Sequence, residues 1–250
     1  MKIGIIIQAR YGSTRLPFKM VKKFYNNFGI LDILINRLIY AKLNIPIILA
    51  TTNNLLDTKI VDIATKNNII FFRGNEKNVL NRFINAAKIN KIDKIIRICA
   101  DNPLLDIGYL KNMINKFKIS DVDYWSYQLP NNKLTILSHF GFWAEGVKLS
   151  ALEKIAKNTN DLKYIEHVTN YIYLNKNKFD IHLEKLDNTN LHENIRLTID
   201  TKSDFQIVKE IYYKIKKENI NLNINNIIKM INENIIWQNQ MKKNIILNEK

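Results

Sequence analysis

Gln-Ala-Arg-Tyr-Gly-Ser-Thr-Arg-Leu-Pro-Phe-Lys, residues 8–19, is the stretch of this sequence that decides its fold class. It follows a continuous apolar run, Ile3–Ile7, which is typical of a buried strand. The stretch holds a glycine, two short hydroxyl side chains and three fixed positive charges. Such a loop suits a polyphosphate, because amides and hydroxyls bind its oxygens and cations offset its charge. Its spacing matches neither a P-loop nor the dinucleotide motif, so it predicts nucleotide binding of another kind.

Strand and helix patterns alternate through the first half of the chain. The predicted strands are Ile3–Ile7, Pro46–Ala50, Ile69–Phe72, Lys94–Cys99 and Tyr124–Tyr127. The predicted helices, where apolar residues recur three and four positions apart, are Ile30–Leu43, Asp57–Asn67, Asn78–Asn90 and Ile107–Phe117. This alternation with short links predicts an α/β fold, a mostly parallel sheet with helices on both faces.

The second half is less regular. The expected elements are a hairpin or irregular arm at 134–147, helices at 148–157, 164–174 and about 203–217, and strands at 179–186 and 196–199. The strand at 196–199 is expected to return to the main sheet, and one docked helix with a frayed end is expected after Asn221. We therefore predict a single domain over 1–220, with a smaller acceptor or dimerisation arm at about 128–190, and a C-terminal helix and tail at 221–250.

Composition restricts the class of protein. The net charge of +15 fits a nucleic-acid binder, but the lysines are dispersed along the chain, so we expect no nucleic-acid partner. Cys99 is the only cysteine, which excludes an intramolecular disulfide and suits a reducing compartment. The N-terminal apolar run is too short for a signal peptide, and no stretch approaches the ~20 apolar residues of a membrane span. We expect a cytoplasmic protein with no membrane partner.

Two aspartates follow predicted strands directly. Asp101 comes after Lys94–Cys99, and Asp200 comes after Leu197-Thr198-Ile199. Ligands of parallel sheets bind at the carboxyl ends of the strands, so both carboxylates are expected near the loop at 8–19. Mg²⁺ is often held by one or two carboxylates together with substrate phosphates. Each aspartate alone also fits a turn or a helix cap, but together with the loop they favour a metal site.

The roles of three further residues are ambiguous. Glu166 and His167 lie on a helical pattern, and no second histidine or cysteine lies at zinc-ligand spacing. Glu145 fits a solvated surface charge equally well. An aromatic group, most simply core or subunit interface, comprises Tyr124, Trp125, Tyr127, Phe140, Phe142 and Trp143.

Several ordered segments together resemble a known family. They are Ile-Ile-Gln-Ala-Arg-Tyr-Gly-Ser-Thr-Arg-Leu-Pro-Phe-Lys (6–19), Ala-Thr-Thr-Asn (50–53), Phe-Arg-Gly-Asn (72–75), Val-Leu-Asn-Arg-Phe (79–83), Arg-Ile-Cys-Ala-Asp-Asn-Pro-Leu-Leu-Asp (97–106), Glu-His-Val-Thr (166–169) and Leu-Thr-Ile-Asp-Thr-Lys-Ser-Asp-Phe (197–205). Over about residues 1–215 the chain resembles the cytidylyltransferase family, in the branch typified by the spore coat polysaccharide biosynthesis protein SpsF. It is more distantly similar to CMP-ketodeoxyoctulosonate and CMP-sialic acid synthetases.

The resemblance implies a Rossmann-like nucleotidyltransferase fold, a homodimer, and the use of CTP and Mg²⁺. It implies catalytic roles for Lys19, Arg15 and Asp101, metal binding by Asp101 and Asp200, and acceptor binding by Glu145, Glu166 and His167. The implied nucleotide-binding residues are Ala9, Arg10, Gly12, Ser13, Thr14, Arg15, Lys19, Arg73 and Asp101. The chain departs from the family pattern at Phe18, where a glycine is common, at Ile165, where an arginine often stands, and in the acceptor segment 141–146.

These expectations predict an enzyme that transfers CMP from CTP to a sugar or sugar acid and releases pyrophosphate, in surface polysaccharide or glycoconjugate biosynthesis. Three alternatives stay open. In the first, the enzyme uses another nucleotide with a sugar-phosphate or non-sugar phosphate acceptor. In the second, the chain is a non-catalytic nucleotide-binding relative. In the third, it is a basic nucleic-acid binder.

Overall fold

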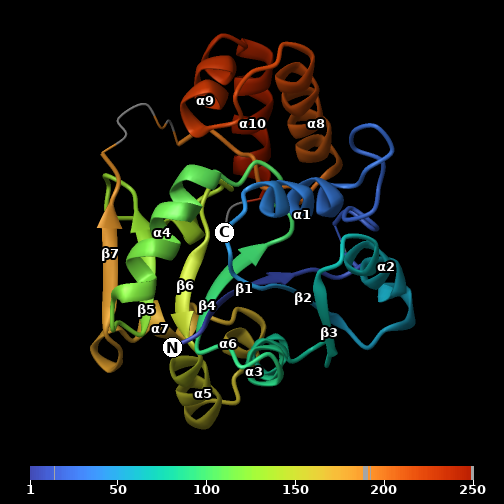
Figure 1. Cartoon of the computed structure of the whole chain (residues 1–250). Helices are drawn as coiled ribbons and strands as arrows, with labels where there is room; N and C mark the ends of the chain where they lie inside the picture. The colour runs from blue at the N-terminus through green and yellow to red at the C-terminus, as the bar shows by residue number, and fades with distance from the viewer. Residues whose placement is uncertain (14, 188–190, 192, 249–250) are drawn as a thin grey trace.

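A seven-stranded sheet with the order β3-β2-β1-β4-β6-β5-β7 forms the centre of the molecule (Figure 1). The computed structural model describes residues 1–13, 15–187, 191 and 193–248. The strands are β1 (Ile3–Gln8), β2 (Ile47–Thr52), β3 (Ile70–Gly74), β4 (Lys94–Cys99), β5 (Tyr124–Gln128), β6 (Glu145–Lys148) and β7 (Ile181–Lys185). Only β6 runs antiparallel to its neighbours in this sheet, so the predicted α/β fold with a mostly parallel sheet is confirmed.

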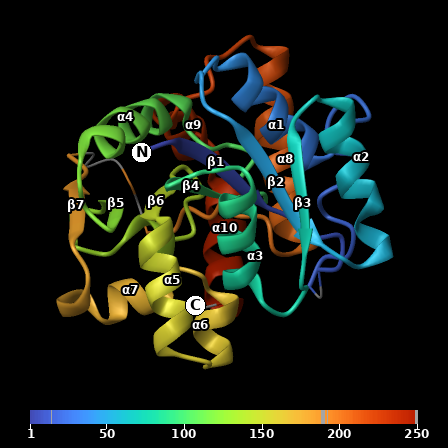
Figure 2. The ribbon, with the colours of Figure 1, turned by 60° about the horizontal axis from the view of Figure 1, so that its bottom comes forward.

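Helices cover both faces of the sheet (Figures 1 and 2). They are α1 (Ile30–Tyr40), α2 (Thr58–Lys66), α3 (Val79–Ile89), α4 (Ile107–Ile119), α5 (Leu149–Asn158), α6 (Leu162–Glu166), α7 (Asn170–Leu174), α8 (Lys202–Lys217), α9 (Ile224–Asn232) and α10 (Ile235–Leu247). Residues of α1, α2, α4 and α8–α10 share the larger hydrophobic core, and residues of α3, α5 and α7 share the smaller one on the opposite face.

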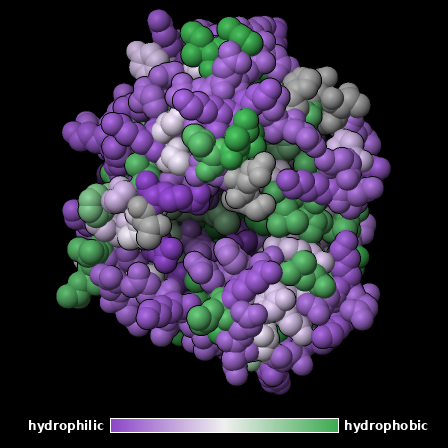
Figure 3. All heavy atoms as spheres, turned by 180° about the vertical axis from the view of Figure 1, so that it is seen from behind, coloured by the Kyte–Doolittle hydropathy of each residue, from purple (hydrophilic) through white to green (hydrophobic). Residues whose placement is uncertain are grey.

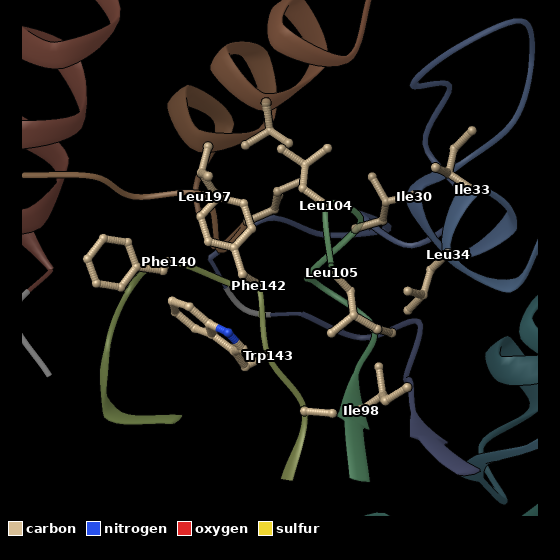
Figure 4. Packing of buried hydrophobic residues seen from close by; sticks show 14 of the residues in the cluster. Ile30, Ile33, Leu34, Ile98, Leu104, Leu105, Phe140, Phe142, Trp143 and Leu197 are labelled. Atoms are coloured by element: carbon tan, nitrogen blue, oxygen red, sulfur yellow. The ribbon is translucent and has the colours of Figure 1, made fainter. Parts of the chain in front are cut away.

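The larger core fixes the loops that leave the carboxyl ends of β1 and β4. Figure 4 shows Leu104 and Leu105, which follow β4, packed among Ile30 and Leu34 of α1 and the ring of Phe142. The predicted aromatic group is core, since all six side chains are buried. Because these loops are anchored by buried side chains, the polar residues between the anchors are held in place.

Three predictions about local structure were wrong. Residues 196–199 form no strand; the amides of Leu197 and Thr198 donate to the carbonyl of His139, and the amide of Ile199 donates to that of Asp101. The expected helix 164–174 breaks between α6 and α7, where the Thr169 hydroxyl turns inward to donate to Glu145. The expected frayed end is helix α10.

The face opposite to the view of Figure 1 is mostly hydrophilic, and its hydrophobic side chains form small separate groups (Figure 3). Within the described part of the chain, no helix combines the length and the apolar character needed to cross a membrane. The predicted domain limits, homodimer and cytoplasmic location stay predictions.

Candidate active site

The loop that follows β1 is anchored by a buried carboxylate. Asp57 accepts hydrogen bonds from the backbone amide of Tyr11 at 2.7 Å and from the hydroxyls of Thr51 and Thr52 at 2.7 and 2.6 Å. Burial alone would raise the pKa of Asp57, but these hydrogen bonds lower the pKa below its ordinary value. Asp57 therefore ties the start of the loop to the end of β2 as a charged acceptor.

The loop ends at a buried lysine that joins both predicted metal aspartates. The Nζ atom of Lys19 lies 3.2 Å from Oδ2 of Asp101 and 3.4 Å from Oδ1 of Asp200. It also donates to the carbonyl of Ile199 at 2.6 Å. Arg15 approaches Oδ1 of Asp200 from the solvent side at 3.1 Å. The predicted convergence of residues 19, 101 and 200 is therefore present in the structure, although Asp200 does not follow a strand as the sequence argument assumed.

The two carboxylates fit a hard divalent cation. One oxygen of each contacts the Lys19 ammonium group, so the two carboxylates present hard oxygen donors close to each other. No group of three or more histidine, cysteine, aspartate or glutamate side chains that could hold a metal occurs among the described residues. Mg²⁺ needs no such group, because it is commonly held by one or two carboxylates, water and substrate phosphates.

Asp200 is held in place from behind by a buried arginine. Arg196 donates to Asp200 Oδ2 at 3.0 Å and to Asp204 Oδ1 at 2.9 Å. Arg196 and Asp204 are both fully buried. Asp204 also caps α8 by accepting from the amide of Thr201 and receives Asn244 of α10 at 3.0 Å. Residues of α8 and α10 thus set the orientation of the Asp200 carboxylate.

A cavity of about 220 Å³ opens above these groups. It is lined by Gln8, Ala9, Arg10, Ser13, Arg15, Lys19, Met20, Arg97, Cys99, Ala100, Asp101, Glu166, His167 and Asp200. Segments far apart in the sequence supply this wall, namely the loop after β1, the end of β4, the α6 end and the segment before α8. Nine of the predicted site residues therefore meet in one cavity.

Four predicted site residues are placed elsewhere or are not described. Gly12 is exposed in the loop and does not line the cavity, and Thr14 lies outside the described residues. Arg73 donates to the carbonyls of Thr52 and Asn54 and does not line the cavity. Glu145 lies behind the cavity wall in β6 and is 1% exposed, so its interpretation as a solvated surface charge was wrong.

The sequence interpretation missed Arg97, which Glu145 holds against the cavity. Glu145 pairs with Nη1 of Arg97 and accepts from the Tyr124 hydroxyl at 2.5 Å and the Thr169 hydroxyl at 3.0 Å. Burial acts to lower the pKa of Arg97, but Cys99 and Glu145 raise the pKa above its ordinary range. The signal was an arginine with apolar residues on both sides inside a predicted strand.

Phe18 explains one departure from the family pattern. Its φ of 63° lies in the left-handed region, which glycine adopts without strain and a bulky residue rarely does. The Phe18 ring is 48% exposed and lies 4.5 Å from the ring of Tyr11, centroid to centroid. Phe18 therefore adopts a backbone conformation that suits glycine, and its ring contacts Tyr11 near the start of the same loop.

Comparisons with known proteins found a matching family model and a similar curated protein. The cytidylyltransferase family model matches residues 4–242. The spore coat polysaccharide biosynthesis protein SpsF of Bacillus subtilis is 32% identical over 237 residues, which cover 93% of this chain and 95% of that protein.

Solved structures show the same fold. The structure of a cytidylyltransferase from Leptospira borgpetersenii has a TM-score of 0.83 and 29% identity, covering 95% of this chain and 96% of that one. A CMP:2-keto-3-deoxy-manno-octonic acid synthetase complexed with CTP has a TM-score of 0.65 and 12% identity, covering 86% of this chain and 99% of that one. At that identity the likeness shows the fold alone.

Proposed function

The chain belongs to the cytidylyltransferase family and is a nucleotidyltransferase, and from this premise we propose that it transfers CMP from CTP to a sugar or sugar acid. In this reaction an acceptor oxygen attacks the α-phosphorus of CTP and pyrophosphate departs. The observation that supports the proposal best is the contact of Lys19 with both Asp101 and Asp200 in one cavity. A role in surface polysaccharide or glycoconjugate biosynthesis belongs to the same proposal, by analogy with the name of the Bacillus relative.

The chain's own residues bind and orient the triphosphate. The cavity wall carries Arg10, Arg15 and Lys19, which we assign to the phosphate oxygens and to the negative charge that gathers on the leaving pyrophosphate. Asp101 and Asp200 would hold a magnesium ion, which would supply further charge neutralisation at the phosphates. In phosphoryl-type transfer the protein contributes mainly the positioning of the reactants and the compensation of charge, and these groups supply both.

The acceptor is assigned to the part of the cavity lined by Glu166 and His167. Both side chains are exposed, so they are free to contact an incoming molecule. Arg97 lines the same cavity, and it adds a fixed donor group that Glu145 orients. Hydroxyls and carboxylates of a sugar or sugar acid match such a mixed set of charged donors and acceptors.

Incubation of the protein with CTP, Mg²⁺ and a panel of ulosonic acids, hexoses and sugar phosphates tests the proposal. We expect one acceptor to yield a CMP-linked product by mass spectrometry, with pyrophosphate released in equal amount. CTP at 100 times its dissociation constant should also raise the free energy of unfolding by about 2.7 kcal/mol in thermal shift. Stabilisation by UTP or GTP but not by CTP, with no cytidine product, would contradict the assignment of CTP.

Replacing Lys19 by methionine should slow pyrophosphate release about 10- to 100-fold, since a charge-assisted contact is worth roughly 1.5–3 kcal/mol. Methionine keeps an unbranched apolar side chain of similar length and removes the ammonium group with its charge and its hydrogen bonds. Lys23→Met, at an exposed position shortly after Lys19, is the control and should leave the rate unchanged. A rate within about twofold of the natural protein for Lys19→Met would show that this ammonium group does not act on the phosphates.

A further inference from the structure

Glu145, the first residue of β6, is a buried carboxylate behind the acceptor part of the cavity, which is the part lined by Arg97, Glu166 and His167. It is the only buried glutamate among the residues that the structure describes. Its Cα lies opposite that of Arg97 in the antiparallel pair of β6 and β4, so both side chains project from the same face of the sheet. A buried charge is costly unless it is paired and hydrogen-bonded, and Glu145 meets both conditions.

Three separate segments of the chain donate to this carboxylate. Arg97 of β4 pairs with Oε1 through Nη1, and the Tyr124 hydroxyl of β5 donates to Oε2 at 2.5 Å. The Thr169 hydroxyl, immediately before α7, lies 3.0 Å from Oε1 and 3.1 Å from Oε2. All three donor residues are buried. Glu145 therefore joins two strands to a turn between helices, in the interior of the protein.

The contact with Thr169 anchors the turn that carries the other two residues of the acceptor part. This turn lies between α6 and α7, and the carbonyl of His167 accepts from the amide of Asn170 at 2.7 Å. Glu166 and His167 are exposed and line the cavity, whereas Thr169 is buried. Since only one or two residues separate the anchored hydroxyl from these side chains, loss of the anchor would let the turn shift at the cavity.

The contact with Arg97 fixes the opposite wall of the acceptor part. Nη1 of Arg97 pairs with Glu145, and Nη2 makes a longer contact of 3.4 Å with Oε1 of Gln8. The guanidinium carbon also lies 5.9 Å from the centre of the Phe83 ring. The carboxylate thus neutralises and orients this cavity-lining side chain, and its removal would leave the guanidinium buried without that counter-charge.

We propose that Glu145 is a positioning residue of the acceptor part, which holds Arg97 and the turn at 166–169 in the places from which they contact the acceptor. The inference rests on the proposed function, which assigns that part of the cavity to the acceptor. It replaces the direct acceptor binding that the family resemblance implied for Glu145, because this side chain is 1% exposed and does not line the cavity. The phosphates of CTP are assigned to the loop after β1, so losing the anchor should affect the acceptor and not CTP.

Thr169→Val tests the inference, because valine has the shape of threonine and carries a methyl group in place of the hydroxyl donor. The KM values of CTP and of the panel compound that the natural protein converts are measured with Mg²⁺ in excess. The acceptor KM should rise at least about fivefold and the KM of CTP should change less than about twofold, since a misplacement of about 1 Å can cost as much as about 100-fold. Thr169→Ser keeps the hydroxyl and should bring the acceptor KM within about twofold of the natural value.

Thr135→Val is the matched control. Thr135 is 5% exposed and its hydroxyl donates to the carbonyl of Tyr127 at 3.1 Å, so the same change removes a buried hydrogen bond outside the cavity lining. Both KM values should stay unchanged in this variant. Hydrogen exchange followed by mass spectrometry adds a readout that needs no acceptor, because the amides of 162–174 should exchange faster in Thr169→Val and not in Thr135→Val.

Glu145→Gln, if it folds, should raise the acceptor KM further than Thr169→Val does, because Arg97 also loses its counter-charge. If it does not fold, the threonine variants decide the question. An unchanged acceptor KM in Thr169→Val would overturn the inference and leave the proposed function intact, since direct binding by Glu145 does not require Thr169. Equal increases in both KM values, or unchanged exchange at 162–174, would also overturn it. If the natural protein converts no panel compound, the proposed function and this inference fail together.

Discussion

Asp101→Asn should lower CTP-dependent pyrophosphate release about 1000-fold, equivalent to about 4 kcal/mol. The change keeps the size of the side chain but removes a charge that contacts Lys19 at 3.2 Å. It also removes one of the two carboxylates that we assign to the metal. Because the side chain of Asp101 is 27% exposed and not enclosed in the core, the protein should fold normally.

Asp121→Asn is the matched control. It makes the same chemical change to an exposed carboxylate that pairs with Lys148 on the surface, and turnover should be unaffected. Titrating Mg²⁺ separates a metal role from a purely electrostatic one, since loss of a ligand raises the concentration needed for half-maximal rate. Turnover of Asp101→Asn close to that of the natural protein would end the proposal that this carboxylate holds the metal.

The proximity of Asp101 to the loop after β1 was predictable because it follows from topology. Strand β4 was predicted with its observed ends, since an apolar run bounded by polar residues marks a buried strand. Once β1 and β4 are parallel neighbours, residues that follow them must share one edge of the sheet. That geometry brings the loop after β1 close to Asp101, whereas the contact of Lys19 itself depends on how the loop is anchored by Asp57 and by buried side chains.

The features that sequence patterns missed depend on tertiary contacts. Polar and apolar residues alternate in the segment 196–199, as they do in a strand. In the structure the backbone amides of this segment donate to the carbonyls of His139 and Asp101. Arg97 and Glu145 are 48 positions apart, so neither residue marks the other as a partner in the sequence. Arg73 was expected near the nucleotide. Its guanidinium donates to the loop at 52–54 instead, and the fold of that loop decides which carbonyls accept these hydrogen bonds.

Asp204→Ala should lower the free energy of unfolding by about 3–5 kcal/mol, because removing one partner of a buried ion pair leaves the other charge uncompensated. Asp204 is fully buried and accepts from Arg196 at 2.9 Å, from the amide of Asp200 at 3.1 Å and from the amide of Thr201 at 2.8 Å. Arg196 would keep only Asp200 as a carboxylate partner. Denaturation by urea, followed by circular dichroism, measures the change.

The matched control is Asp121→Ala, whose surface pair with Lys148 should contribute little to stability. The same variant of Asp204 has a second readout, since Arg196 orients Asp200 as well. If the variant stays folded at low temperature, its half-maximal Mg²⁺ concentration for turnover should rise, because Asp200 is no longer fixed from behind. A loss of stability below about 1 kcal/mol would mean that Arg196 finds another acceptor, and the buried network would then not be what holds the metal-binding carboxylate in place.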